Sequence, residues 1–399
     1  MKGATSMRDR RWQAGVVVGA AAGIGAAWLN RRVQRTARAG LVDWARAERL
    51  AAGRLARFPG ALDQAEIARS GDMYVAAMRR IVPALEAELG TPLPGVVERH
   101  AAVSRAQWAS ANLVVFRQLY GQIEAALGDR LAPRTGNLGE GLAALANRTV
   151  ATQQVAFVLA YLSTRVLGQY DIALLSAEAR PGQLLFVEEN IRATAEALRV
   201  PLDDFRVWVA LHETTHAFEF EAHPWLRPYL ADRLERQLAG FIDDARLLSV
   251  EGLGRVVRRW RNRGAAGLIE GLLEPEQRRL FRETQAVMSL LEGFGDWVMD
   301  RVGASFLPDV RMLRERFEER RGQPRRGLDG IVSRVMGMDL KLAQYRRGER
   351  FVAGVAEAGG ARAVGHLWDG PESLPTEVEL DDPRLWVRRV VGAPERRAP

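Results

Sequence analysis

The sequence predicts a mainly α-helical protein with a small β-sheet, an α+β fold. Apolar residues recur at three- and four-residue spacings from Leu41 onward, as amphipathic helices require. Strand-like sequence is scarce and lies between residues 166 and 190. The chain has 399 residues, of which 47% are hydrophobic and 27% charged, so it has ample material for a core. We therefore expect a folded protein of the size of an enzyme.

The helical sequence is interrupted by Pro and Gly at residues 59–60, 92–95 and 133–136. Since it contains no internal repeat and no long low-complexity linker, we expect one domain, 41–399, preceded by an N-terminal appendage, 1–40. The expected parts of the domain are a helical first half, 41–165; a small β element, 166–190; two helices, 203–220 and 284–301; and a helical C-terminal part, 302–399.

Residues 170–175 and 183–188 are the best candidates for strands. A turn containing Pro181 and Gly182 lies between them, so the two can pair as a hairpin.

The appendage contains a run without charge, residues 14–29, flanked by arginines on both sides. The run is shorter than the roughly 20 apolar residues of a spanning helix and consists mainly of Gly and Ala. It is compatible with a helix packed on the protein, with membrane contact and with an export signal. The chain has no cysteine, which fits a reducing cytoplasm. We expect a cytoplasmic protein, with membrane association or export through residues 14–29 as the alternative.

The net charge of +8 comes from 57 basic and 49 acidic residues that are interleaved along the chain. Nucleic-acid binders concentrate basic residues on one element, so we expect no nucleic-acid partner. The absence of cysteine also excludes thiolate ligands and thiol nucleophiles, which leaves His, Asp and Glu to hold any metal ion.

One motif carries chemistry: H-E-x-x-H, formed by His212, Glu213 and His216. On a helix, positions i and i+4 share a face, so both imidazoles can bind one Zn²⁺ ion with Glu213 beside them. Zinc acidifies water, and Glu213 can take the proton and pass it to a leaving group. Asp203 or Asp204 is expected to cap this helix. The other interpretation, two histidines satisfied within a core helix, requires the motif to have arisen by chance.

A zinc site needs a third protein ligand. Glu292 is the best candidate, and Asp296, one turn later on the same helix, is expected to accept the outer N–H of a ligating histidine. Gly293 and Gly295 predict that another backbone approaches this helix closely. His223 misses the spacing of a third histidine ligand by one residue and precedes Pro224, so we interpret it as structural.

These motifs resemble a bacterial family of zincin-like, zinc-dependent metallohydrolases often labelled as associated with deazaflavin-coenzyme biosynthesis. The similarity covers most of the chain after residue 40. It includes the segments 42–44, 166–171, 208–226 and 291–293, followed by Lys341, Gln344, Tyr345, Gly348, Phe351 and Val352. The glutamate-ligand branch of zincins carries E-x-x-x-D on a second helix, which Glu292 and Asp296 reproduce. Leu291 stands where the best-known members have Asn.

The resemblance implies a zincin-like architecture and a hydrolytic site, and its link to the deazaflavin coenzyme is only associative. In peptidase relatives an edge strand lies antiparallel to the substrate, a role that residues 183–188 can fill if they are not an ordinary sheet strand. Tyr345 and His366 are the candidates for stabilising an oxyanion, with Tyr345 preferred.

The sequence thus predicts a zinc hydrolase in which His212, His216 and Glu292 bind the metal and Glu213 is the general base. The substrate is expected to be a peptide or a small compound with an amide bond. The alternative is a catalytically silent zincin scaffold that serves as a binding protein, with its apolar amino terminus as a membrane tether. The pathway and the oligomeric state are not predicted.

Overall fold

A computed structural model describes residues 40–92, 99–131, 138–170, 183–243, 275–322 and 338–392. These residues form two compact units where the sequence predicts one domain. One unit comprises the chain up to Ala56 together with Ala109–Tyr161, and the other comprises Arg57–Trp108 and the chain from Leu162 onward. The appendage, the apolar run 14–29 and the turn at 181–182 lie outside the described residues. None of the described helices is both long and apolar enough to cross a bilayer.

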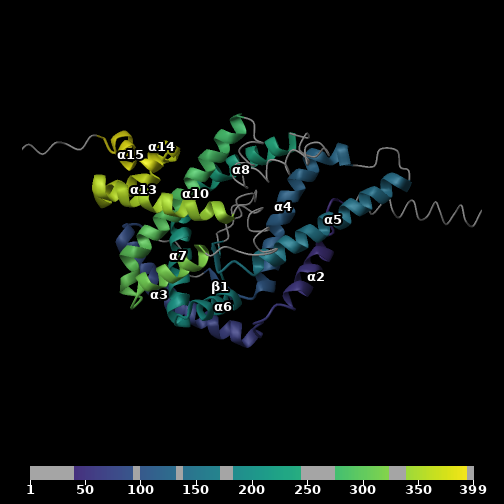
Figure 1. Cartoon of the computed structure of the whole chain (residues 1–399), viewed down its shortest axis with the longest axis horizontal. Helices are drawn as coiled ribbons and strands as arrows, with labels where there is room; N and C mark the ends of the chain where they lie inside the picture. Colours follow the sequence, from purple (N-terminus) through teal and green to yellow (C-terminus); the bar gives the residue numbers. More distant parts are fainter. Residues whose placement is uncertain are drawn as a thin grey trace, which may run out of the picture. The chain divides into compact units, whose positions relative to one another are not determined.

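The first unit is helical, with α2 (Trp44–Leu55), most of α4 (Arg105–Leu131) and most of α5 (Leu138–Ser163) (Figure 1). Asp43 caps α2, because its side chain accepts a hydrogen bond from the backbone N–H of Arg46 at 3.1 Å. Small and aliphatic residues of α2 and α5, such as Ala51 and Leu159, fill a core of this unit's own. That separate core accounts for the division of the chain.

The second unit carries the predicted site. Its elements along the chain are α3 (Gln64–Leu89), β1 (His100–Val103), β2 (Gly168–Tyr170), β3 (Leu184–Val187), α6 (Glu188–Leu198), α7 (Leu202–Ala222), α8 (Leu226–Asp243), α10 (Pro275–Val302), η3 (Gly303–Ser305), α11 (Val310–Gly322), α13 (Met338–Gly365), η4 (His366–Trp368), η5 (Pro371–Ser373), α14 (Glu377–Asp381) and α15 (Pro383–Val390). The predicted fold class, mainly α with a small sheet, is confirmed.

The sheet has three strands in the order β1-β3-β2, with β1 parallel and β2 antiparallel to β3. Every residue of β3 is buried: Leu184 and Phe186 face the main core, whereas Leu185 and Val187 face a smaller cluster around Trp108. A strand covered on both faces has a continuous apolar sequence, as this one has. The proposed role of residues 183–188 as a substrate-binding edge is therefore wrong, since β3 is paired on both sides. The described edges are β1 and β2.

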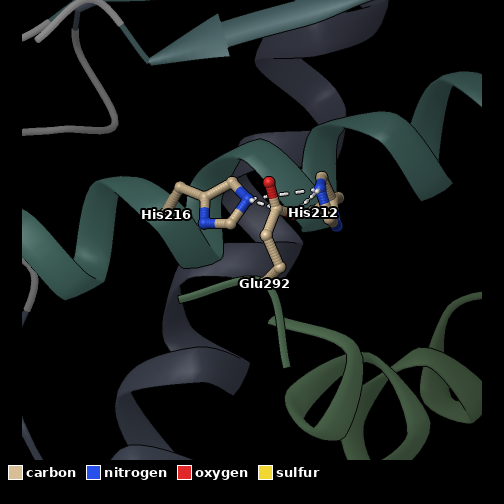
Figure 2. Close-up of side chains that lie close together, drawn as sticks. All are labelled: His212, His216 and Glu292. Atoms are coloured by element: carbon tan, nitrogen blue, oxygen red, sulfur yellow. Dashed lines mark hydrogen bonds and ion pairs between the residues drawn. The ribbon is translucent and has the colours of Figure 1, made fainter. Parts of the chain in front are cut away.

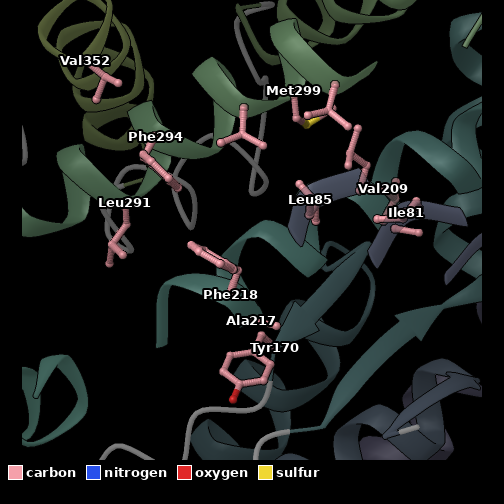
Figure 3. Close-up of a cluster of buried hydrophobic side chains, with 14 of the residues drawn as sticks. Ile81, Leu85, Tyr170, Val209, Ala217, Phe218, Leu291, Phe294, Met299 and Val352 are labelled. Carbon is pink, nitrogen blue, oxygen red and sulfur yellow. The ribbon is translucent and has the colours of Figure 1, made fainter. Parts of the chain in front are cut away.

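The main core of the second unit lies between α3, α7, α10 and the sheet (Figure 3). Ile81 and Leu85 come from α3, Val209 and Phe218 from α7, and Phe294 from α10. Burying a side chain of this size contributes about 1.5–3 kcal/mol. The site helices α7 and α10 are thus held mainly by their apolar faces.

Helices α10 and α13 cross at two glycines. A Cβ atom added to Gly293 would overlap the backbone of Gly348, and one added to Gly348 would overlap the carbonyl oxygen of Ser289. The two main chains are therefore in direct contact, as Gly293 predicted. Gly295 instead faces the site, where an added Cβ would lie 3.5 Å from Cε1 of His216 and 3.8 Å from Cε1 of His212.

Candidate metal centre

Helix α7 begins at Leu202, with Pro201 at the N-cap position and no side-chain cap. The predicted capping role of Asp203 or Asp204 is wrong, because both residues already lie in the first turn. Asp203 pairs with Arg206 at 2.8 Å. Negative charge in a first turn still favours the helix by complementing its dipole.

Burial along α7 separates a site face from a core face. Between Trp208 and Phe220, only His212, Glu213 and His216 are partly exposed, and all the other residues are buried. The hydroxyls of Thr214 and Thr215, within the motif, donate to backbone carbonyls one turn earlier at 2.6 and 3.0 Å. The helix therefore presents its three chemically active side chains together on one side.

The two histidines and Glu292 converge at one point (Figure 2). Nε2 of His212 and Nε2 of His216 are 3.2 Å apart. The Oε2 atom of Glu292, on α10, lies 3.8 Å from the first nitrogen and 3.6 Å from the second. The two helices thus bring together residues that are 76 positions or more apart in the sequence, since 292 − 216 = 76.

This arrangement fits a zinc ion. Two ligand atoms that bind one tetrahedral Zn²⁺ at about 2.0–2.1 Å lie roughly 3.3 Å apart, close to the three separations found here. Two imidazoles and one carboxylate form a usual set of protein ligands at a catalytic zinc site. The side chains of His212, His216 and Glu292 are 13%, 16% and 14% exposed, so the site can be reached from outside.

His216 has a buried carboxylate partner, Glu219, which sequence reasoning missed. The Nδ1 atom of His216 lies 2.8 Å from Oε2 of Glu219, one turn later on α7. An N–H at Nδ1 can donate to this carboxylate, while Nε2 faces Glu292 and His212. His212 is placed differently, because its ring stacks on Trp208 with centroids 6.0 Å apart and planes at 5°.

The charges at this site favour a cation. Burial raises the pKa of Glu219 to about 7, although the neighbouring His216 lowers it. Burial alone would lower the pKa of His216, but Glu219 and Glu292 outweigh burial and raise that pKa well above its ordinary value. The two carboxylates therefore favour positive charge on the imidazole of His216.

Glu213 lies beside the metal ligands and against strand β2. A Cβ atom added to Gly168 would lie 2.5 Å from Cγ of Glu213 and 3.0 Å from its Oε1. The absence of a side chain at residue 168 therefore leaves room for the Glu213 carboxylate between α7 and the edge strand. The arrangement groups three residues that could hold a metal ion, with Glu213 next to His212 in the sequence.

The family model that describes zincin-like metallopeptidases matches residues 42–387. The chain belongs to this family. A solved structure from Chloroflexus aurantiacus, described as "a putative hydrolase with a novel fold", is similar to it with 34% sequence identity and a TM-score of 0.65. The match covers 88% of this chain and all of that one. No curated protein matches the sequence significantly.

In this zincin-like chain, Asp296 lies one turn after Glu292 on α10 and points toward α11. Its Oδ2 atom is 4.0 Å from a guanidinium nitrogen of Arg314. Arg314 also pairs with Asp300, at 2.8 Å, and with Glu349. The predicted hydrogen bond from a ligating histidine to Asp296 stays a prediction, whereas the one carboxylate with a described contact of this kind is Glu219.

Of the remaining predicted residues, His366 and His223 are not grouped with the three candidate ligands. Tyr345 is in α13, but its side chain falls outside what the structure describes. His366 is 38% exposed and pairs through Nδ1 with Asp369 at 2.6 Å. His223 ends α7, stacks on Trp368 with centroids 5.1 Å apart, and does not belong to the group of metal ligands. The oxyanion role of Tyr345 or His366 remains a prediction.

A second buried acid fixes the start of the motif helix. Glu188 is fully buried and accepts hydrogen bonds from Tyr74 at 2.9 Å, from Arg192 at 2.9 Å and from Arg206 at 3.1 Å. Burial opposes its ionisation, but the hydrogen bonds from Arg206 and Arg192 outweigh burial and lower its pKa. These contacts join α3, α6 and α7 one and a half turns before His212.

Proposed function

We propose that this protein is a zinc-dependent hydrolase that cleaves an amide or peptide bond. The observation that carries the proposal is the convergence of His212, His216 and Glu292 with Glu213 on the same exposed face of α7. Membership of the zincin-like metallopeptidase family supports it. The solved relative from Chloroflexus aurantiacus supports hydrolysis in general and names no bond.

In this proposal His212, His216 and Glu292 hold the zinc ion. A zinc ion held by such residues acidifies water and polarises a carbonyl group. Glu213 takes the proton of the attacking water and delivers it to the leaving nitrogen, a role that contributes about 10²- to 10⁴-fold in rate. Gly168 leaves the space in which the Glu213 carboxylate moves.

An amide nitrogen leaves only with a proton, and the proposed proton transfer by Glu213 would supply it. We expect a peptide or a small compound with an amide bond. A cytoplasmic location and membrane contact through residues 14–29 stay predictions, and fractionation of cells expressing the whole chain would test both.

The decisive experiment compares the wild-type protein with Glu213→Gln in a product screen against a peptide and amide library. The amide keeps the shape of the side chain and removes its basicity, so we expect full zinc content and a loss of turnover of at least about 100-fold. Glu221→Gln is the matched control, since Glu221 lies on the same helix and pairs with Arg99 and Arg227.

Undiminished turnover of Glu213→Gln would exclude this residue as the base. Zinc binding with no turnover of any compound by the wild-type protein would favour the catalytically silent scaffold instead.

A further inference from the structure

Glu219 lies on the motif helix, three residues after His216, among apolar neighbours. Ala217, Phe218 and Phe220 surround it in the sequence, and its own side chain has no exposed surface. Burying a carboxylate costs several kcal/mol unless charged or polar partners compensate for the loss of water. An acid at this position therefore requires a reason other than packing.

The contacts of Glu219 are directed at one group. Oε2 is 2.8 Å from Nδ1 of His216, and Oε1 has no hydrogen-bond partner among the described residues. Glu188, equally buried, has three partners instead. A carboxylate retained for stability would satisfy both oxygens, so the single contact to the histidine indicates a task at the metal centre.

Helix geometry explains how Glu219 can act on His216. Residues three apart share a face, so Glu219 reaches the outer nitrogen of His216 from the same helix, without depending on the position of α10. The bond fixes the ring plane and keeps the proton on Nδ1, which directs Nε2 toward Glu292. His212 has aromatic stacking on Trp208 in the corresponding place.

We propose that Glu219 is a positioning residue of the metal centre, which sets the tautomer and orientation of His216 so that α7 alone presents two pre-aligned nitrogens. The functional motif of the helix is thereby extended from H-E-x-x-H to H-E-x-x-H-x-x-E. The inference rests on the proposed zinc function, but it concerns metal binding and does not depend on which bond is cleaved.

The test measures the zinc dissociation constant by competition with a chromophoric chelator. Glu219→Ala removes the acceptor and should weaken zinc binding about 10- to 100-fold, the usual effect of losing such a partner. Glu219→Gln keeps an amide oxygen that can still accept from Nδ1, so its loss should be smaller than that of Ala. Glu221→Gln should bind zinc as the wild-type protein does.

A second measurement separates positioning from a structural role. Thermal unfolding of the metal-free proteins should show little difference between the wild-type protein and Glu219→Gln, because the substitution keeps shape and removes a buried charge. A structural role would instead lower the unfolding temperature of the metal-free protein and leave the zinc constant of the folded fraction unchanged.

Three outcomes decide the matter. Zinc constants within about threefold of wild type for both Glu219 variants would overturn the proposal. Failure of the wild-type protein to bind zinc would overturn it together with the proposed function. Zinc binding that is weakened more by Glu219→Ala than by Glu219→Gln supports the proposal. This holds even if neither the variants nor the wild-type protein hydrolyse any amide.

Discussion

Two fully buried carboxylates in the second unit, Glu188 and Glu219, have opposite surroundings. Glu188 receives hydrogen bonds from two arginines and a tyrosine, and its pKa is lowered. Glu219 contacts one imidazole, and burial raises its pKa to about 7. The first acid is fully compensated and ties three helices together, whereas the second leaves a charge requirement that a cation can meet. Burial of an acid therefore does not by itself mark a site, but incomplete compensation does.

The largest effect is expected when the compensated acid loses its main partner. Arg206→Met leaves Glu188 buried with fewer cations and should lower the free energy of unfolding by about 3–5 kcal/mol, measured by urea denaturation. Arg236→Met is the control, since Arg236 forms an exposed pair with Asp232 that contributes about 0.3–0.5 kcal/mol. An equal, small change for both variants would mean that the Glu188 network does not stabilise the fold.

Removal of a metal ligand should act on zinc and much less on the fold. Glu292→Ala leaves two histidines and should weaken zinc binding more than the roughly 100-fold upper range expected for residues that only orient a ligand. Asp296→Asn should have a smaller effect, and His223→Ala should leave zinc content nearly unchanged. Metal analysis of the three purified variants tests this order. Loss of zinc from His223→Ala, with retention in Glu292→Ala, would assign a three-histidine site instead.

A substitution at Gly168 can displace Glu213, the proposed base, while leaving its side chain unchanged. In Gly168→Ala the new methyl group would lie 2.5 Å from Cγ of Glu213, so the side chain must rotate away. A displacement of about 1 Å at a reacting group costs on the order of 100-fold in turnover. Zinc content should be unaffected, and steady-state kinetics with metal analysis would show both. Wild-type turnover in this variant would show that Glu213 acts from another conformation.

The smallest effect concerns the half-buried imidazole of His223. Burial lowers the pKa of His223 to about 4, below the value of about 6.5 in an unfolded chain. Between these values the unfolded state binds the additional proton, so this contribution to stability is lost as the pH falls from about 6.5 to 4. The expected loss between pH 7.5 and pH 5 is at most about 2 kcal/mol, because solvent screening at this half-buried residue reduces the full effect.

His223→Phe keeps the stacking on Trp368 and should remove this part of the acid sensitivity. Urea denaturation of both proteins at the two pH values measures it, and identical pH dependence would contradict the lowered pKa.

Local patterns in the sequence were enough for the centre of the site. His212 and His216 are four residues apart, so helix geometry alone places them on one face. Glu292 could be predicted because an acid in an otherwise apolar stretch of helix needs a partner. Glu219 is also an acid among apolar residues, since it lies between Phe218 and Phe220. Its importance could be recognised only if His216, three residues earlier, were known to face the site. How α7 packs decides that, and the sequence does not show it.

The pairing of strands that are far apart in the chain could not be predicted from the sequence. Strand β1 has only four residues, His-Ala-Ala-Val, with weak strand propensity, and it forms because β3 offers a parallel partner. The position of β3 at the centre of the sheet depends on β1, so residues 183–188 could not be distinguished from an edge strand. The division into two units likewise depends on which helix faces pack together, and neither composition nor linkers indicate it.

The crossing of Gly293 and Gly348 has a consequence for how finely the third ligand can be adjusted. Glu292 immediately precedes the contact, and no side chain separates the two backbones that could be lengthened or shortened. The position of the Glu292 carboxylate thus depends on where the main chain of α13 lies. Substitutions in α13 that shift its backbone should therefore move Glu292 on α10 relative to His212 and His216 on α7. The geometry of the candidate metal site thus depends on a helix that contributes none of the three grouped residues.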